Sequence, residues 1–184
     1  MKLIILDRDG VINYDSDLYI KSPEEWQPIP GSVEAIARLT QNGWRCVVAT
    51  NQAGVGRELF DMATLNAMHS KMHRAVAQAG GRIEAVFYCP DTDASKSFCR
   101  KPNPGMLLAI SERYNVPLDD VPMVGDAIRD IQAAQKAGAQ PILVLTGKGE
   151  TTRADAAFPS GTPVYADLAA VAQALCAWAC GLRT

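Results

Sequence analysis

The chain has 184 residues, of which 48% are hydrophobic and 21% are charged, and its formal net charge is −2. This length suits one domain with a sizeable core, and the lack of any basic run argues against nucleic acid or an anionic membrane as a partner. No apolar run approaches the roughly 20 residues that cross a bilayer, and the first apolar run is too short for a secretion signal. We therefore expect a single, monomeric, cytoplasmic domain over residues 1–184.

Apolar runs and amphipathic stretches alternate along the chain. Continuous apolar runs, which are typical of strands buried on both faces of a parallel sheet, occupy residues 2–6, 44–50, 83–89, 121–126 and 141–147. Helical spacing predicts helices over residues 32–42, 61–79, 105–115, 128–138 and 167–180, and the segments 90–104 and 151–163 are expected to be loops. The alternation predicts an α/β fold with a doubly wound parallel sheet and helices on both faces.

Local signals mark the ends of two predicted helices. Ser32 is the expected N-cap of the first helix, and Gly43 and Gly138 are the expected stops of the first and fourth. The five cysteines are an odd and scattered set, so no disulfide framework is expected in a reducing compartment. Cys176 and Cys180 fall on the last predicted helix and are predicted to be buried thiols.

Polar side chains follow four of the predicted strands, at the edge where open parallel sheets bind ligands. The first strand leads into Asp7 and Asp9, which point to the same side of an extended segment. The other three strands lead to Thr50, Asn51 and Gln52, to Arg100 and Lys101 through a loop, and to Asp126. Together with Asp126, the first two aspartates predict an all-oxygen pocket of the kind that suits Mg²⁺.

The predicted pocket also indicates phosphoryl chemistry. Three clustered carboxylates repel one another unless a cation lies between them. Mg²⁺ with a bound phosphate group removes this repulsion, because the metal bridges carboxylate and phosphoryl oxygens. Lys101 and Thr50 are then placed to stabilise the remaining phosphoryl oxygens, where charge lies in the transition state.

Four motifs resemble those of the haloacid dehalogenase superfamily of phosphohydrolases, and they occur in that family's order over nearly the whole chain: "DRDG", "TNQ", "RKP" and "GDAIRD". Within the superfamily, the stretches "LDRDGVIN", "ATNQAGVGRELF", "YCP", "CRKPNPGMLL" and "MVGDAIRDIQAA" are most similar to the D-glycero-D-manno-heptose 1,7-bisphosphate 7-phosphatases. Histidinol-phosphate phosphatases share much of this pattern, as do some polynucleotide 3′-phosphatases.

The resemblance implies a role for each matching residue. Asp7 would be the nucleophile that forms an aspartyl-phosphate, and Asp9 would be the general acid and then the general base. Thr50 and Lys101 would stabilise the phosphoryl group. Mg²⁺ would be held by Asp7, Asp9 (through its backbone carbonyl) and Asp126. The residues implied to contact a sugar-phosphate substrate are Asp15, Ser16, Asp17, Leu18, Asn51, Gln52 and Arg100.

The resemblance also implies a pathway: removal of the C7 phosphate on the way to ADP-heptose and the heptose units of lipopolysaccharide. The chain departs from many relatives at a zinc loop with the pattern Cys-x-His and Cys-x-Cys. Here the two pairs read Cys89-Pro90-Asp91 and Ser97-Phe98-Cys99, so no structural Zn²⁺ is expected. The segments after Asp9 and after Gln52 are too short for a cap domain, which predicts an open site.

Several alternatives remain open at the level of sequence. A receiver-like phospho-acceptor module also combines an acidic cluster with a threonine and a lysine, although its acceptor aspartate follows the third strand. Asp130 is either a neighbour of the site or an acid favoured by a helix N-terminus. His69 and His73 share one helix face, and we expect a surface or packing pair remote from the acidic strand ends.

Overall fold

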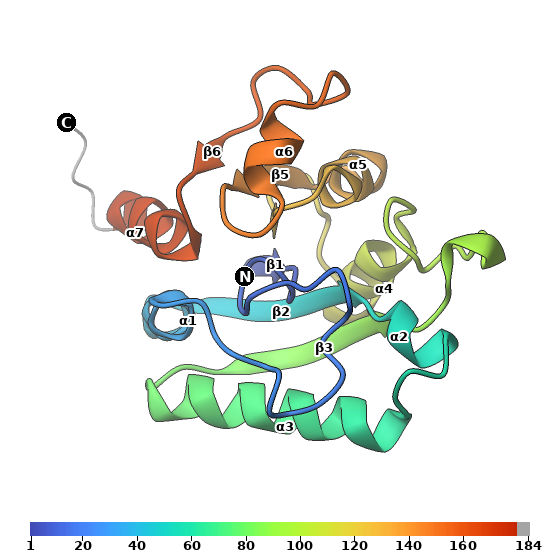
Figure 1. The fold of residues 1–184 in the computed structure, drawn as a ribbon. Coiled ribbons are helices and arrows are strands. Elements are labelled where there is room, and N and C mark those ends of the chain that lie inside the picture. Colours follow the sequence, from blue (N-terminus) through green and yellow to red (C-terminus); the bar gives the residue numbers. More distant parts are fainter. Residues whose placement is uncertain (180–184) are drawn as a thin grey trace.

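The computed structural model describes residues 1–179, which form one six-stranded parallel sheet with helices on both sides (Figure 1). The strand order is β3-β2-β1-β4-β5-β6. The strands are β1 (Lys2–Leu6), β2 (Trp44–Asn51), β3 (Ile83–Cys89), β4 (Pro122–Gly125), β5 (Gln140–Val144) and β6 (Val164–Tyr165). The chain therefore builds outward from β1 in one direction and then restarts at β4 in the other, which confirms the doubly wound fold.

The helices differ in length and position. The longer ones are α1 (Ser32–Gln41), α3 (Met62–Gln78), α4 (Gly105–Tyr114), α5 (Ile128–Ala137) and α7 (Leu168–Ala179). Two short helices, α2 (Ala53–Gly56) and α6 (Gly149–Arg153), lie in loops, and a 3₁₀ turn covers Asp93–Ser95. Among the described residues near the site, only loops, the short helices α2 and α6 and the 3₁₀ turn interrupt the alternation of strands and longer helices. None of these segments is long enough to form a cap domain.

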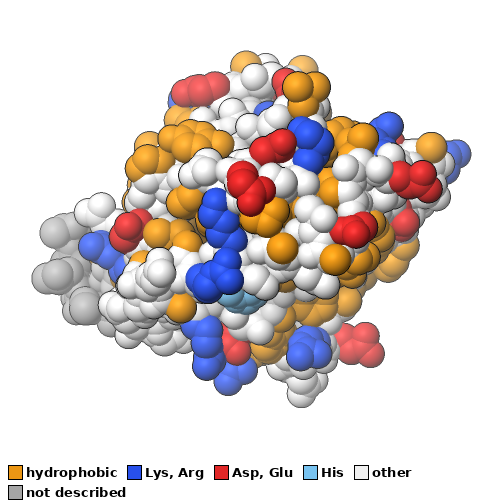
Figure 2. Space-filling model, turned by 60° about the horizontal axis from the view of Figure 1, so that its bottom comes forward, with side chains coloured by type: hydrophobic (Ala, Val, Ile, Leu, Met, Phe, Trp, Pro, Cys, Tyr) orange, Lys and Arg blue, Asp and Glu red, His pale blue; other side chains and the backbone are white. Residues whose placement is uncertain are grey.

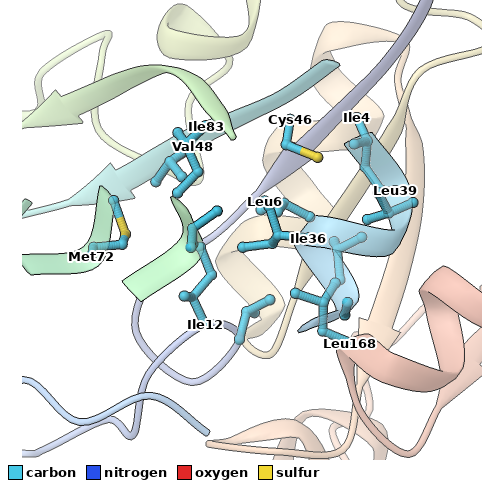
Figure 3. Close-up of a cluster of buried hydrophobic side chains, with 14 of the residues drawn as sticks. Ile4, Leu6, Ile12, Ile36, Leu39, Cys46, Val48, Met72, Ile83 and Leu168 are labelled. Carbon is cyan, nitrogen blue, oxygen red and sulfur yellow. The ribbon is translucent and has the colours of Figure 1, made fainter. Parts of the chain in front are cut away.

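Each central strand buries both of its faces. In β1, Ile4 and Leu6 pack on the side of α1, α3 and α7, whereas Leu3 and Ile5 pack on the side of α4 and α5. Figure 3 shows side chains from β1, β2, α1, α3 and α7 meeting in the first of these two layers. Because both faces are apolar, the strands read as continuous apolar runs, and truncating one such side chain to alanine would cost roughly 2–5 kcal/mol.

The ends of the first helix show one wrong prediction and one correct one. Gly31, with φ of 84°, precedes the helix, and Ser32 is its first residue instead of its N-cap. The Ser32 hydroxyl donates to the carbonyl of Ile12 at 2.6 Å, so it ties the loop after β1 to the helix. Gly43 has a φ of 81° and Gly138 a φ of 78°, which are the left-handed conformations that end helices.

Two further predictions need correction, and a third falls outside the described residues. The expected loop over residues 151–163 contains the end of α6, and the short strand β6 follows it. Cys89 and Cys99 form a disulfide, although no disulfide framework was expected from the scattered thiols. The bond forms because the 90–98 loop returns to its starting point at the end of β3, a closeness that sequence separation does not reveal. Residue 180, which ends the predicted last helix, lies outside the described residues, as does the Cys180 thiol.

The surface carries mixed charge on the face that includes α3. Figure 2 shows basic and acidic side chains interspersed there with apolar ones. No helix in the part of the chain that the structure describes is long and apolar enough to cross a membrane.

Candidate active site

Three carboxylates meet where the winding of the sheet changes direction. Asp7 follows β1 and Asp126 follows β4, and these strands are neighbours, with the Asp7 N–H donating to Val124 O at 2.9 Å. Asp130 lies in the first turn of α5 and joins them. Carboxylate oxygens of Asp7, Asp126 and Asp130 all lie within 4.8 Å of one another, and all three residues are buried. The sheet therefore brings together two of the predicted aspartates and one whose role was open.

Lys101 lies against this cluster. Its Nζ atom is 2.9 Å from Asp7 Oδ1 and 2.6 Å from Asp130 Oδ1, and it donates to the carbonyl of Ala49 at 2.8 Å. The Asn51 side chain fixes the lysine backbone, because its Nδ2 donates to Lys101 O and its Oδ1 accepts from Lys101 N. Asn51 was predicted to contact substrate, and the structure uses both ends of its amide to position Lys101.

Asp126 sits in a tight backbone cradle. A Cβ on either Gly10 or Gly147 would collide with its carboxylate, so both neighbours must be glycine. The Lys148 N–H donates to Asp126 Oδ2 at 2.7 Å, whereas Asp126 Oδ1 is buried and has no hydrogen-bond partner among the described residues. A buried carboxylate oxygen without a partner is costly, so a cation ligand role fits it well.

The pKa values of Asp7 and Asp126 are raised because these carboxylates are buried close to other negative charges. Burial, followed by the charges of Asp130 and Asp7, raises the pKa of Asp126 to about 8. Burial and the charge of Asp130 raise the pKa of Asp7 to about 6, against the opposing effect of Lys101. Burial also acts on Asp130, but Lys101 and Arg129 outweigh it and hold the Asp130 pKa below its usual value. Hard oxygen donors in this arrangement fit Mg²⁺.

The Asp9 carboxylate is held apart from the other three. Arg8 donates to it from Nε and Nη2, each at 3.0 Å, and Asn13 Nδ2 donates at 2.8 Å. Gln52 Nε2 donates to Asp9 Oδ2 and to the Thr50 hydroxyl, both at 3.0 Å. Gln52 therefore links the predicted general acid to the predicted phosphoryl-binding threonine, and all three lie in one hydrogen-bonded group.

A hollow of about 350 Å³ adjoins Asp126 and is lined by Tyr14, Asp15, Ser16, Asp17, Gly147 and Lys148. The Lys148 Nζ atom lies 3.4 Å from Asp15 Oδ2 and 3.3 Å from Asp17 Oδ1. Three of the four predicted substrate residues in this loop thus face a common space beside the carboxylates. The fourth, Leu18, is 76% exposed and does not line it.

Arg100 is engaged by its own loop. Its Nε donates to Asp93 Oδ1 at 2.8 Å, and its Nη1 donates to the carbonyl of Asp91 at 3.1 Å. The Asp93 side chain is 78% exposed, so this ion pair lies at the solvent boundary. The proposed contact between Arg100 and a substrate stays a prediction.

The loop between Cys89 and Cys99 brings Cys89, Asp91 and Cys99 together, with their ligand atoms within 4.8 Å of one another. The two sulfur atoms are bonded to each other, and Asp91 Oδ2 lies 3.7 Å and 3.6 Å from them. Structural Zn²⁺ takes four separate ligands, usually nitrogen or thiolate sulfur, and this group does not supply them. The expected absence of structural zinc stays a prediction.

Sequence reasoning missed three charged residues at this site. Lys148 follows β5, so the rule that located the other residues also points to it. Arg8 is completely buried behind Asp9, which its place in a charged motif does not reveal. Arg129 is mostly buried and its charge acts on Asp7, Asp126 and Asp130, but its side chain could equally have pointed to solvent from the start of a helix.

A doubly wound parallel sheet with carboxylates after β1 and β4 and a buried lysine between them defines a haloacid dehalogenase-like hydrolase. A family model described as HAD-hydrolase-like matches residues 98–171. A D-glycero-β-D-manno-heptose-1,7-bisphosphate 7-phosphatase from Bordetella bronchiseptica is 59% identical over 175 residues, covering 95% of this chain and 98% of the relative. One of the same name from Pseudomonas putida is 54% identical, covering 95% and 99%.

The solved structures agree with these relatives. The heptose 1,7-bisphosphate phosphatase of B. bronchiseptica, complexed with magnesium and phosphate, has a TM-score of 0.93 and 59% identity, with coverage of 95% of this chain and 98% of that one. The chain therefore belongs to the D-glycero-β-D-manno-heptose-1,7-bisphosphate 7-phosphatase family. The resemblance inferred from the motifs is confirmed.

Proposed function

We propose that this chain is a Mg²⁺-dependent phosphatase that removes the C7 phosphate of D-glycero-β-D-manno-heptose 1,7-bisphosphate through an aspartyl-phosphate on Asp7. The observation that carries the proposal is the buried group of Asp7, Asp126, Asp130 and Lys101 at the switch point, in a chain 59% identical to a relative of that name. The reaction would serve the synthesis of ADP-heptose for lipopolysaccharide.

Asp7 and Lys101 have complementary tasks in this mechanism. Asp7 Oδ1 accepts hydrogen bonds from the Arg8 N–H at 2.7 Å and from Lys101, which leaves Oδ2 to attack phosphorus. Lys101 and the Thr50 hydroxyl would bind the phosphoryl oxygens as negative charge shifts onto them. Mg²⁺ held by Asp7, Asp126 and the Asp9 backbone carbonyl would supply the positive charge that lets two anions approach.

Asp9 would handle the protons. It would give a proton to the departing sugar oxygen and then take one from the water that hydrolyses the aspartyl-phosphate. Its hydrogen bonds to Arg8, Asn13 and Gln52 keep the carboxylate oriented beside Asp7. A receiver-like module lacks such a group two residues after its acceptor, which supports turnover instead of a stored phosphoryl group.

The loop after β1 would bind the sugar. Asp15, Ser16 and Asp17 line the hollow beside Asp126, where their oxygens can accept hydrogen bonds from sugar hydroxyls. We further propose that residues 1–184 act as a single monomeric domain, since all of these groups come from one chain. A cytoplasmic location fits a charged sugar phosphate, which does not cross a bilayer unaided.

A substrate panel tests this proposal. Phosphate release should be fastest with the β anomer of the heptose bisphosphate, slower with the α anomer, and slow with histidinol phosphate or a 3′-phosphorylated oligonucleotide. Faster turnover of histidinol phosphate than of either heptose anomer would refute the substrate assignment alone. A single burst without steady release, on every ester, would refute the phosphatase itself.

A further inference from the structure

His69, in the middle of α3, contacts Arg8, the residue that holds the Asp9 carboxylate. Its Nε2 atom lies 3.4 Å from Nη1 of Arg8, and the two residues are 8% and 0% exposed. The sequence placed this histidine away from the acidic strand ends, and that prediction is wrong. The reason is that α3 packs beneath the loop that begins at Asp7, a proximity set by the fold.

The hydrogen-bond direction between these two side chains is fixed by chemistry. A guanidinium has only donors, so Nε2 of His69 must accept and the ring proton must reside on Nδ1. Burial, followed by the charges of Arg8 and His73, lowers the pKa of His69 to about 4, against the opposing effect of Asp9. The imidazole is therefore neutral near pH 7, which is the state that can accept from arginine.

Arg8 uses its remaining donors on Asp9. Nε and Nη2 each donate to the Asp9 carboxylate at 3.0 Å, in a two-point fork, while Nη1 faces His69. A planar guanidinium gripped at both ends cannot rotate freely, so the histidine sets the plane in which the fork meets the carboxylate. A buried path of two contacts thus runs from His69 to the proposed general acid.

We propose that His69 is a positioning residue that, acting through Arg8, orients the Asp9 carboxylate for proton transfer to the leaving group. The inference rests on the role of Asp9 in the proposed function. It assigns His69 no contact with substrate or metal, so its effect must pass through Arg8 and Asp9 alone.

This role has a signature that general packing lacks. An alkyl leaving group, such as a sugar oxygen, needs a proton as the ester bond breaks, whereas an acidic phenol leaves readily as its anion. Loss of orientation at Asp9 should therefore slow phosphoryl transfer to Asp7 much more from alkyl phosphates than from activated aryl phosphates. Loss of overall structure or of metal binding would slow both classes alike.

The experiment compares His69→Ala, His69→Gln and His73→Ala with the wild-type chain, each with Mg²⁺, on glycerol phosphate and p-nitrophenyl phosphate. For His69→Ala we expect kcat/KM, which reports phosphoryl transfer to Asp7 and not the later hydrolysis of the aspartyl-phosphate, to fall about 10- to 100-fold on the alkyl ester and less than about 3-fold on the aryl ester. Glutamine can present an acceptor oxygen near the position of Nε2, so His69→Gln should recover most of the alkyl rate. His73 lies one turn away and is exposed, and His73→Ala should match wild type.

Two results would overturn the inference: equal losses of kcat/KM on both esters in His69→Ala, or no recovery of kcat/KM on the alkyl ester in a His69→Gln protein whose urea midpoint matches wild type. If His69→Ala does not fold, the His69→Gln variant decides. Its ratio of alkyl-ester to aryl-ester rates should match wild type, because glutamine replaces the acceptor that His69 provides. A stable His69→Gln protein with a changed ratio would contradict the inference. The generic esters keep this test separate from the substrate assignment, which the panel of heptose bisphosphates and histidinol phosphate tests.

Discussion

The Nζ atom of Lys101 lies 2.6 Å from Oδ1 of Asp130, and both side chains are completely excluded from solvent. The same aspartate accepts a hydrogen bond from the Ala127 N–H at 3.0 Å through Oδ2. Asp130 therefore has both of the roles that the sequence left open, since one oxygen stabilises the start of α5 and the other holds the lysine. Through Lys101, a helix terminus is connected to Asp7.

Removing this lysine should destabilise the fold as well as the reaction. In Lys101→Met, Asp7 and Asp130 lose their buried counter-charge, and we expect the free energy of unfolding without metal to fall by roughly 3–5 kcal/mol. Urea denaturation in the presence of chelator measures this free energy of unfolding. Lys136→Met, on the exposed side of α5, is the matched control and should change stability by less than about 0.5 kcal/mol. A loss below about 1 kcal/mol in Lys101→Met would contradict the ion-pair assignment.

Asp7→Asn should abolish turnover and leave the fold intact. An amide oxygen is a poor nucleophile and a weaker Mg²⁺ ligand, so we expect steady phosphate release to drop at least about 10³-fold. The urea midpoint without metal should stay near or above that of wild type, because the change removes one of three repelling carboxylates. Near-normal release by this variant would rule out the covalent mechanism.

The metal-free protein should lose stability as the pH rises from about 7 to 9. Asp126 has a folded pKa of about 8, far above its usual value of 3.8, so the native state holds a proton there that the unfolded state has released. The contribution is full only below the unfolded pKa, decreases steadily as the pH rises, and is gone above the folded pKa, so the interval from pH 7 to 9 covers the last part of the loss. Other shifted groups titrate elsewhere, namely Asp7 near 6, His69 near 4 and Cys46 near 12.

Thermal unfolding with chelator at several pH values measures this effect. Asp126→Asn carries no titrating group and should flatten the curve between pH 7 and 9. Added Mg²⁺ should stabilise wild type increasingly over the same range, because it binds the deprotonated carboxylate. A wild-type curve that is flat or rising in chelator would disprove the raised pKa of Asp126.

The strand ends explain why much of this site could be predicted from sequence. Each apolar run marked a strand, and the parallel alternation fixed which edge would collect Asp7, Thr50 and Asp126. What a side chain does after the strand ends depends on packing that no local pattern encodes. The Asn51 side chain hydrogen-bonds to the backbone of Lys101, and the buried Arg8 side chain contacts Asp9 and His69. The disulfide likewise depends on how a loop closes in space.

Metal analysis should find activity dependent on Mg²⁺ and independent of zinc. Chelator should abolish phosphate release and Mg²⁺ alone should restore it, because the three carboxylates and an anionic substrate repel one another without a cation. Zn²⁺ in purified protein should lie far below one equivalent, whether or not a reductant has opened the bond between Cys89 and Cys99. One equivalent of zinc that resists chelation would show that the 89–99 loop binds metal after all.

The ion pair between Arg100 and Asp93 gives a way to test substrate recognition from two directions. Asp93 is largely exposed, so breaking the pair in Asp93→Ala should cost at most about 1 kcal/mol of stability. If Arg100 binds the distal part of the substrate, Asp93→Ala frees its guanidinium and should lower KM for the heptose bisphosphate about 2- to 5-fold.

Arg100→Ala should reduce kcat/KM for the bisphosphate at least about 10-fold and for p-nitrophenyl phosphate less than about 3-fold. Arg113→Ala, on the exposed side of α4, is the control and should change neither. Equal losses on both substrates in Arg100→Ala would mean that this arginine only supports the loop.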